Sequence, residues 1–383
     1  MTYSLREYSA MIADSARADA YVAAMERVVR PGMTVLDLGA GSGFFSFEAC
    51  RLGARRVYAI DPNPALLAAR ETAAANALGD RIVFLPVVST EVELPERVDV
   101  VVSDMRGVLP LHTQHLPTLI DARTRFLATS GVLLPWRDTL VLSVFEAPDV
   151  HRRQLQPWGG RESPYSAEPI VRLLANDWAS ATLPVEAQLT RPASWATIDY
   201  HTTTSPNVAG RVRCNVTRAG VGHGVGMWFE AEVMSGIRFS SGPAVPCSIY
   251  GTGFFPWPET VPLAEGDVVD VAVRADLVGR EYVWRWVTRI EDGAGPARVK
   301  ARFDQSTFFG KPAAVDMLHR QAPDHRPQVT DALAVDRFVL GLFGDDLTLA
   351  EIADAASARF PEQFGPGRDA FARVAALSAR YRT

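Results

Sequence analysis

The stretch VLDLGAGSGFFSFEA, from Val35 to Ala49, decides the fold of this chain. It starts with a short apolar run, continues with Gly39, Gly41 and Gly43, and ends in residues with helical spacing. This order predicts a buried strand, a tight turn and the first turn of a helix. Glycine permits positive φ angles and close backbone approach, and a helix N-terminus presents unpaired N–H groups. The stretch therefore predicts a site for a nucleotide-like ligand.

Strand-like and helix-like segments alternate on both sides of this turn. Such alternation is typical of a parallel sheet with helices on both faces, a doubly wound, Rossmann-like domain. The residues before it, 5–30, carry apolar side chains at helical spacing and predict an amphipathic helical lead-in. The expected strands are Thr34–Leu38, Arg56–Ile60, Arg81–Leu85, Val98–Val102 and Val132–Pro135, and the expected helices are Phe44–Arg51, Pro64–Ala77 and Leu116–Leu127.

After Pro135 the pattern changes to β-type segments separated by Gly, Pro and Asn turns, which predicts an antiparallel sandwich or barrel. A Pro-rich and charged stretch, 321–329, has the composition of a linker. The residues that follow return to helical spacing. We therefore predict an α/β + β chain of three domains: a helical lead-in with the Rossmann-like domain (1–135), a β-barrel or sandwich domain (136–320) and a small α-rich domain (330–383).

The last domain resembles small winged-helix domains, some of which bind the leader peptides of modified peptides. Thr348 and Glu351 have the spacing of a capping box at a helix start. Asp345, Asp346 and Asp354 make the region that would meet DNA acidic, which argues against DNA binding.

The overall composition sets broad limits on function. Apolar residues make up 48% of the 383 residues and charged residues 22%, enough for a large core. The net charge is −5 without a basic stripe, so no nucleic-acid partner is expected. Three widely spaced cysteines and the absence of a His-rich cluster predict reduced thiols and no metal site. No segment has the pattern of a signal peptide or a membrane helix, so we expect a cytoplasmic protein without membrane contact.

Two acidic residues narrow the ligand expected at the glycine turn. Asp37 lies on the strand before the turn, and Asp61 ends the next strand, about 20 residues after Gly39, where an acidic side chain can bind ribose hydroxyls. A dinucleotide-binding domain would have G-x-G-x-x-G, and here the third glycine comes one residue early. The sequence Asp-Leu-Gly-Ala-Gly-Ser-Gly, from Asp37 to Gly43, resembles the corresponding motif of class I S-adenosylmethionine-dependent methyltransferases.

Across residues 1–310 the chain resembles the protein arginine methyltransferase family, as a bacterial offshoot that lacks the family's two loop glutamates. Its high Ala and Arg content suggests a GC-rich genome. The resemblance is carried by MIADSARADAY (Met11–Tyr21), by STEVELPERVDVVVSDMRG (Ser89–Gly107) and by FSSGPAVPCSIYGTGFFPWPETVPLAEGD (Phe239–Asp267). It implies S-adenosyl-L-methionine as cofactor, a β-barrel domain and a homodimer docked through a helical arm at Arg172–Ser180.

The resemblance and the glycine turn together give the expected cofactor site. Arg17 stands where the family's arginine pairs with the cofactor carboxylate, and Glu91 lies beside Thr90, where a glutamate usually contacts adenine. The residues expected to bind the cofactor are Tyr8, Met11, Arg17, Asp37, Gly39, Ala40, Gly41, Gly43, Asp61, Pro62, Thr90, Glu91 and Ser103.

The acceptor site departs from the family. Two glutamates that clamp the substrate guanidinium become Asp104 and Thr113, Arg106 adds a positive charge, and the Thr-His-Trp motif becomes Ser248-Ile249-Tyr250. Burying a guanidinium without paired carboxylates is costly. We therefore predict a methyltransferase of specialised metabolism that acts on a non-arginine acceptor, a small natural-product-type molecule or a peptide.

Two alternatives stay open: an arginine methyltransferase with an altered clamp, and an inactive subunit that binds S-adenosylmethionine. The pattern does not identify the acceptor or the atom that is methylated. The candidate catalytic residues follow the fourth strand, at the carboxyl edge of the sheet, where such residues are expected. They are Asp104, His112 and His115, and the candidate substrate-binding residues are Arg106, Thr113, His223, Tyr250 and Phe254.

Overall fold

The computed structural model describes residues 3–157, 161, 164–245, 249–293, 298–312, 319–320, 322–328, 330–364 and 370–381. It divides the chain into two compact units, Met1–Pro312 and Ala313–Thr383. Cys247 and Ser248 lie outside the described residues.

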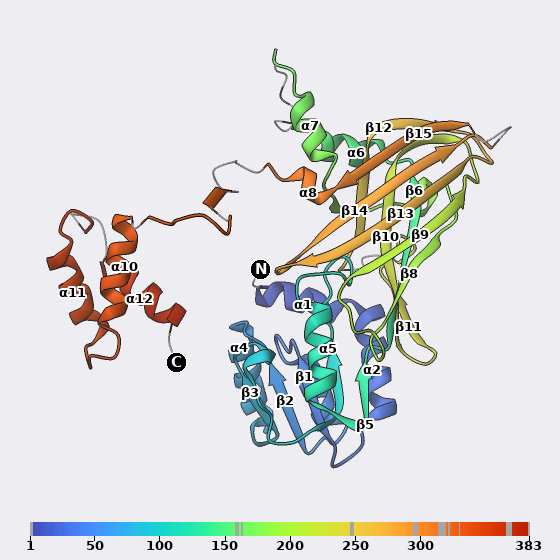
Figure 1. Cartoon of the computed structure of the whole chain (residues 1–383). Helices are drawn as coiled ribbons and strands as arrows, with labels where there is room; N and C mark the ends of the chain where they lie inside the picture. Colours follow the sequence, from blue (N-terminus) through green and yellow to red (C-terminus); the bar gives the residue numbers. More distant parts are fainter. Residues whose placement is uncertain are drawn as a thin grey trace. The chain divides into compact units, whose positions relative to one another are not determined.

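A five-stranded parallel sheet forms the first part of the larger unit, in the order β3-β2-β1-β4-β5 (Figure 1). The central strand β1 is buried along its whole length because helices cover both faces, so its side chains are apolar except at Thr34 and Asp37. The doubly wound fold predicted from the sequence is therefore confirmed. Its elements are β1 (Thr34–Leu38), α3 (Phe44–Arg51), β2 (Arg56–Ile60), α4 (Ala65–Ala75), η1 (Gly79–Arg81), β3 (Ile82–Leu85), η2 (Ser89–Glu91), β4 (Val98–Ser103), α5 (His115–Arg125) and β5 (Leu127–Leu134).

The predicted lead-in forms two helices, α1 (Leu5–Ala13) and α2 (Ser15–Val28). Asp14 separates them because its side chain caps α2 by accepting from the backbone N–H of Arg17 at 3.3 Å. Within α2, the Tyr21 hydroxyl donates to the carbonyl of Ser103 at 2.8 Å, which fixes the helix on the end of β4. The lead-in therefore lies at the carboxyl edge of the parallel sheet.

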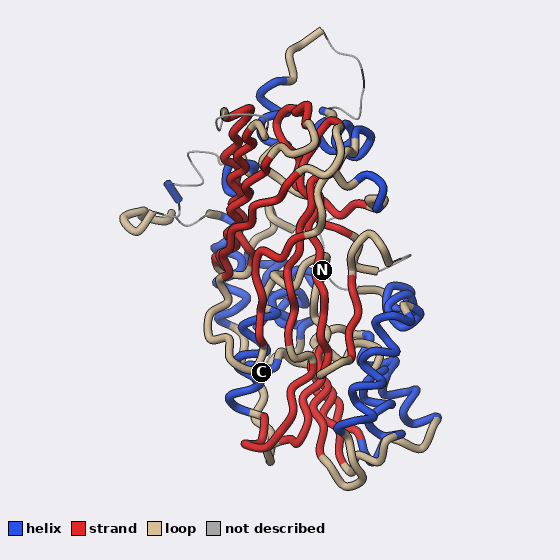
Figure 2. The backbone as a smooth tube through the Cα atoms, turned by 90° about the vertical axis from the view of Figure 1, so that its right-hand side faces the viewer, coloured by secondary structure: helices blue, strands red, loops and turns tan. Residues whose placement is uncertain are grey.

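Two antiparallel sheets form the rest of the larger unit, in the orders β7-β12-β10-β6-β8, with β11 paired to β10, and β15-β14-β13-β9. Figure 2 shows these long strands extending beyond the parallel sheet. Trp257, Trp284 and Trp286 are fully buried in the core of this part. The predicted β domain is therefore confirmed. Its strands are β6 (Arg137–Phe145), β7 (Ala179–Ala181), β8 (Ala193–Asp199), β9 (Val208–Asn215), β10 (Gly220–Met234), β11 (Ile237–Ser240), β12 (Thr252–Leu263), β13 (Val268–Val278), β14 (Glu281–Glu291) and β15 (Val299–Ser306).

Short helices interrupt this β part. They are α6 (Pro148–Leu155), α7 (Glu168–Leu174), η4 (Val185–Ala187) and α8 (Thr307–Gly310). The strongly polar α6 was not predicted from the sequence.

The described residues of the smaller unit include the helices α10 (Asp331–Gly341), α11 (Leu349–Arg359) and α12 (Ala370–Tyr381). They share a small apolar core that includes Val335, Ile352 and Val374. The predicted capping box at Thr348 and Glu351 is present at the start of α11. The α-rich character is confirmed, and the described residues of this unit contain no strand pair that would form a wing. Among the described helices of the whole chain, none has the length and apolar character needed to cross a membrane.

Candidate functional site

The glycine turn after β1 leaves no room for side chains. Gly39, Gly41 and Gly43 have φ angles of 80°, 52° and 86°, which other residues rarely adopt. A Cβ atom on Gly41 would lie 2.2 Å from the ring of Tyr8, and one on Gly39 would lie 2.6 Å from Cγ of Met105. Tyr8 comes from α1, so the lead-in lies directly over the turn (Figure 1). The turn and its cover form a cradle that only glycines fit.

The carboxylate of Asp61 faces this cradle. Its Oδ2 accepts from the backbone N–H of Gly41 at 2.8 Å, and its Oδ1 accepts from the backbone N–H of Asn63 at 2.7 Å. Burial raises the pKa of Asp61, and these two backbone donors oppose the rise. Asp61 therefore lies at the position where the sequence predicts an acceptor for sugar hydroxyls.

Asp37 places a buried carboxylate with an unused oxygen at the end of β1. Its Oδ2 accepts from the Ser46 hydroxyl at 2.7 Å, whereas its Oδ1 has no hydrogen-bond partner among the described residues. Burial raises the pKa of Asp37 to about 7. Buried polar atoms normally have partners, so the unused oxygen is suited to a ligand that carries N–H or O–H donors.

The other residues expected at the cofactor are spread along the same edge. Thr90 and Glu91 lie in η2 and are exposed, as is Pro62. The buried Ser103 ties β4 to β1, because its hydroxyl donates to the carbonyl of Leu38 at 2.8 Å. The backbone carbonyl of Met11 accepts a hydrogen bond from Arg17 Nη1 at 3.0 Å.

Asp104 follows β4 and is surrounded by donors. Arg17 Nε forms a short ion pair with its Oδ2, and Arg106 Nη1 donates to its Oδ1 at 2.8 Å. The Tyr250 hydroxyl donates to Oδ2 at 2.6 Å. Burial alone would raise the pKa of Asp104, but the two guanidinium groups and Tyr250 outweigh it and lower the pKa to about 2. Asp104 is therefore a carboxylate at every ordinary pH.

Arg106 connects Asp104 to the barrel. It binds Asp138 of β6 with two parallel hydrogen bonds, from Nε to Oδ2 at 2.7 Å and from Nη2 to Oδ1 at 2.8 Å. The Tyr200 hydroxyl also donates to Asp138, at 2.5 Å. Both charged side chains are fully buried. Sequence reasoning missed Asp138 and Tyr200; the one available signal was an acidic residue at the start of an apolar strand.

The two candidate histidines differ in their surroundings. His115 is buried, and its Nε2 lies 3.1 Å from the Tyr200 hydroxyl, behind the Arg106–Asp138 pair. Burial lowers its pKa to about 3. His112 is half-buried against Gly107, and burial lowers its pKa as well. The exposed Thr113 between them has a φ of 40°.

The structure does not bring all the predicted substrate residues together. Tyr250 reaches Asp104 and packs against Phe229 of β10, at 4.9 Å between ring centroids. His223 lies six residues before Phe229 in β10, roughly 20 Å away at strand spacing. Phe254 is buried in a separate apolar cluster with Phe145 and Trp228. The side chains of Phe254 and His223 therefore lie in other parts of the barrel than Tyr250. Their proposed roles in substrate binding stay predictions.

No group of three or more His, Cys, Asp or Glu residues that would hold a metal ion occurs among the residues that the structure describes.

The fold and the cradle are those of a class I methyltransferase domain joined to a β-barrel domain. The family model of ribosomal protein L11 methyltransferase (PrmA) matches residues 19–141, the sheet around the cradle. The predicted resemblance to a protein arginine methyltransferase-like family is confirmed by relatives and solved structures.

Among curated proteins, the chain is 31% identical over 245 residues to a probable protein arginine N-methyltransferase 6 of Arabidopsis thaliana, covering 61% of this chain and 54% of that protein. It is 28% identical to protein arginine N-methyltransferase 6 of Xenopus laevis, covering 57% of this chain and 68% of that protein. The alignments span 54% to 62% of the length of the first relatives.

Two solved structures show the same fold. The structure of Arabidopsis thaliana protein arginine methyltransferase 10 matches with a TM-score of 0.70 at 20% identity. The match covers 79% of this chain and 98% of the solved chain. The Trypanosoma brucei PRMT1 enzyme–prozyme complex with AdoHcy also has a TM-score of 0.70, at 18% identity, covering 78% and 97%.

These findings overturn the prediction of a non-arginine acceptor. The curated relatives are named protein arginine N-methyltransferases, including those of Arabidopsis thaliana, Xenopus laevis and Schizosaccharomyces pombe. The prediction took the shorter Asp104 and the added Arg106 as evidence against a guanidinium acceptor. In the structure Asp104 does accept from guanidinium groups, those of Arg17 and Arg106.

Proposed function

We propose that this chain binds S-adenosylmethionine and methylates arginine side chains of a protein substrate. The observation that carries the proposal is the environment of Asp104, a buried carboxylate beside the glycine cradle that already accepts from Arg17 and Arg106. A carboxylate with a pKa of about 2 that binds guanidinium groups within the molecule has the chemistry needed to bind a substrate guanidinium. The names of the curated relatives support the same acceptor.

The cradle residues fit the cofactor. The unused oxygen of Asp37 is suited to an ammonium or hydroxyl donor, and Asp61 to sugar hydroxyls. Arg17 is the residue proposed to pair with a ligand carboxylate. The cofactor supplies a methyl group on a sulfonium, so transfer is a displacement in which positioning provides much of the rate.

The chain's own residues set the order of contacts at Asp104. While Arg17 and Tyr250 both bind Oδ2, that oxygen is poorly available to a substrate. When Arg17 turns to a ligand carboxylate, Oδ2 loses its strongest donor and gains capacity for a substrate guanidinium. Arg106 stays on Oδ1, anchored by Asp138, and holds the carboxylate in place.

A second candidate function is a subunit that binds the cofactor without transferring the methyl group. The charge balance favours it, because Arg17 and Arg106 already neutralise Asp104 and Asp138 in the buried network. The exposed Thr113 stands where the family resemblance expects the second clamping glutamate. A substrate guanidinium would then meet a site without excess negative charge.

One experiment separates the two. The full chain is incubated with methyl-labelled S-adenosylmethionine and arginine-rich peptides, and binding of the demethylated product is measured in parallel by calorimetry. Label on arginine that disappears in Asp104→Asn, with product binding kept, supports the methyltransferase. Binding without label on any arginine peptide supports the non-transferring subunit, and absence of binding refutes both.

Homodimerisation belongs to the same proposal. The segment Arg172–Ser180 includes the end of α7 and the start of β7 and is the proposed arm. Light scattering on the intact chain, compared with a variant in which exposed Ile170 of α7, two residues before the arm, is changed to Asp, tests it. A dimer that dissociates in the variant supports the arm, and a monomeric wild type refutes it.

A further inference from the structure

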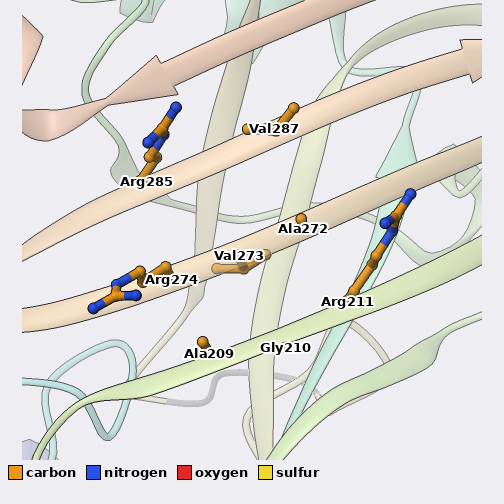
Figure 3. Close-up of a pocket in the computed structure, with 8 residues that line it drawn as sticks. All are labelled: Ala209, Gly210, Arg211, Ala272, Val273, Arg274, Arg285 and Val287. Carbon is orange, nitrogen blue, oxygen red and sulfur yellow. The ribbon is translucent and has the colours of Figure 1, made fainter.

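The outer face of the sheet β15-β14-β13-β9 carries a shallow concavity far along the chain from the glycine cradle. Its volume is about 440 Å³, and eight residues line it (Figure 3). Three of these residues are arginines, and each lies on a different strand: Arg211 on β9, Arg274 on β13 and Arg285 on β14. The floor between them is made of small or apolar residues, including Ala209, Gly210, Ala272 and Val287.

Each of these arginines has an acidic neighbour that lies deeper than the arginine itself. Arg211 donates from Nε and Nη2 to Asp270, and Arg285 donates from the same atoms to Asp304. The Arg211 side chain is 69% exposed, whereas that of Asp270 is 10% exposed. The carboxylates therefore orient the guanidinium groups. The bonds to Asp270 and Asp304 leave Nη1 of Arg211 and Arg285 unused, and the bond to Asp276 uses only Nε of Arg274, so each guanidinium keeps N–H groups that can bind an anion.

The register of the strands places like charges side by side. Arg274 on β13 is the direct cross-strand partner of Arg285 on β14, and Arg289 on β14 is the partner of Arg302 on β15. Like charges in directly opposed positions destabilise a sheet. Neighbouring carboxylates pair with Arg274, Arg285 and Arg289 and offset part of this cost, and an anionic partner would offset more of it.

We propose that this arginine face, defined by Arg211, Arg274 and Arg285, binds an acidic segment of another protein. Carboxylates are the natural partners of forked guanidinium groups, and the apolar floor gives an aliphatic side chain between two acidic residues a place to pack. A single-stranded nucleic acid fits less well. The concavity has no aromatic lining residue on which a base could stack.

The test measures fluorescence anisotropy of the full chain with a labelled peptide in which pairs of glutamates alternate with single leucines. The same peptide with glutamine in place of glutamate and a labelled oligothymidylate serve as comparison probes. The variants are Arg274→Gln/Arg285→Gln and, separately, Arg211→Gln. The matched control is Arg51→Gln/Arg152→Gln, which removes two exposed, ion-paired arginines elsewhere on the molecule. Thermal midpoints of all variants confirm that the fold is intact.

The expected result is saturable binding of the glutamate peptide that weakens about tenfold in the double variant and severalfold in Arg211→Gln. It should also weaken as salt rises, because the charges are exposed. The control should bind like the wild type. The proposal is overturned if the glutamate peptide does not bind saturably, if the glutamine peptide or oligothymidylate binds as tightly, or if the control weakens as much as the variants.

Discussion

Arg106 Nε lies 2.7 Å from Oδ2 of Asp138, and this buried ion pair joins the loop after β4 to the first strand of the barrel, β6. Both side chains are inaccessible to solvent, and both are held by further hydrogen bonds. A buried pair of this kind specifies geometry more than it adds stability, and breaking it by removing one partner is costly. The pair therefore fixes the position of Asp104 relative to the barrel.

Asp138→Ala should lower the free energy of unfolding by about 3–5 kcal/mol, because Arg106 would stay buried without its counter-charge. Urea denaturation measures the change. The matched control is Asp276→Ala, which removes the partner of the exposed Arg274 and should cost less than about 1 kcal/mol. The double change Arg106→Met/Asp138→Leu should recover part of the loss, since it removes both charges. Equal effects of Asp138→Ala and the control would contradict this account of the pair.

Asp61→Ala should weaken binding of the demethylated cofactor about tenfold or more, because the variant loses the acceptor that faces the glycine turn. Isothermal calorimetry with S-adenosylhomocysteine gives the dissociation constant. Asp80→Ala, on the exposed η1 segment, is the control and should leave binding unchanged. If the two variants bind alike, Asp61 does not contact the ligand.

Gly41→Ala should destabilise the chain more than Gly266→Ala does. Both glycines have positive φ angles, so both substitutions carry a backbone strain of about 1–2 kcal/mol. Only at Gly41 does the new Cβ also meet a side chain, the ring of Tyr8 at 2.2 Å, whereas nothing lies within 4 Å at Gly266. Thermal unfolding of the two variants measures the difference, and adding Tyr8→Ala to Gly41→Ala should reduce it. Equal midpoints for the two single variants would show that Tyr8 moves aside freely.

The glycine turn and Asp61 could be predicted from the sequence because local patterns encode them: a strand, a turn and a second strand end within 30 residues. The Arg106–Asp138–Tyr200 network could not, because it joins residues far apart in the chain whose meeting depends on how the barrel packs on the sheet. His115 illustrates the same limit. Its position after β4 follows from the sequence, but its burial against Tyr200 depends on contacts with the barrel.

His115 should make the stability of the chain depend on pH. Its pKa is about 3 in the folded chain, because burial disfavours the charged ring, and about 6.5 when unfolded. The unfolded chain therefore binds more protons between these values, and stability falls as pH is lowered from about 6.5 toward 3. Relative to a His115→Gln variant, the wild type should lose about 2 kcal/mol of unfolding free energy between roughly pH 7.5 and 4.5.

Urea denaturation of both proteins at these two pH values measures this relative loss. The control is His325→Gln, which changes an exposed histidine in the smaller unit and should leave the pH dependence as it is in the wild type. Comparison with a variant is necessary because Asp37, whose pKa is raised to about 7, contributes in the opposite direction. Asp37 binds more protons in the folded chain than in the unfolded chain, so the chain loses stability as pH rises from about 4 to 7. Since Asp37 is present in all three proteins, its contribution cancels in the difference. A pH dependence that His115→Gln leaves unaltered would mean that the ring is open to protonation in the folded chain.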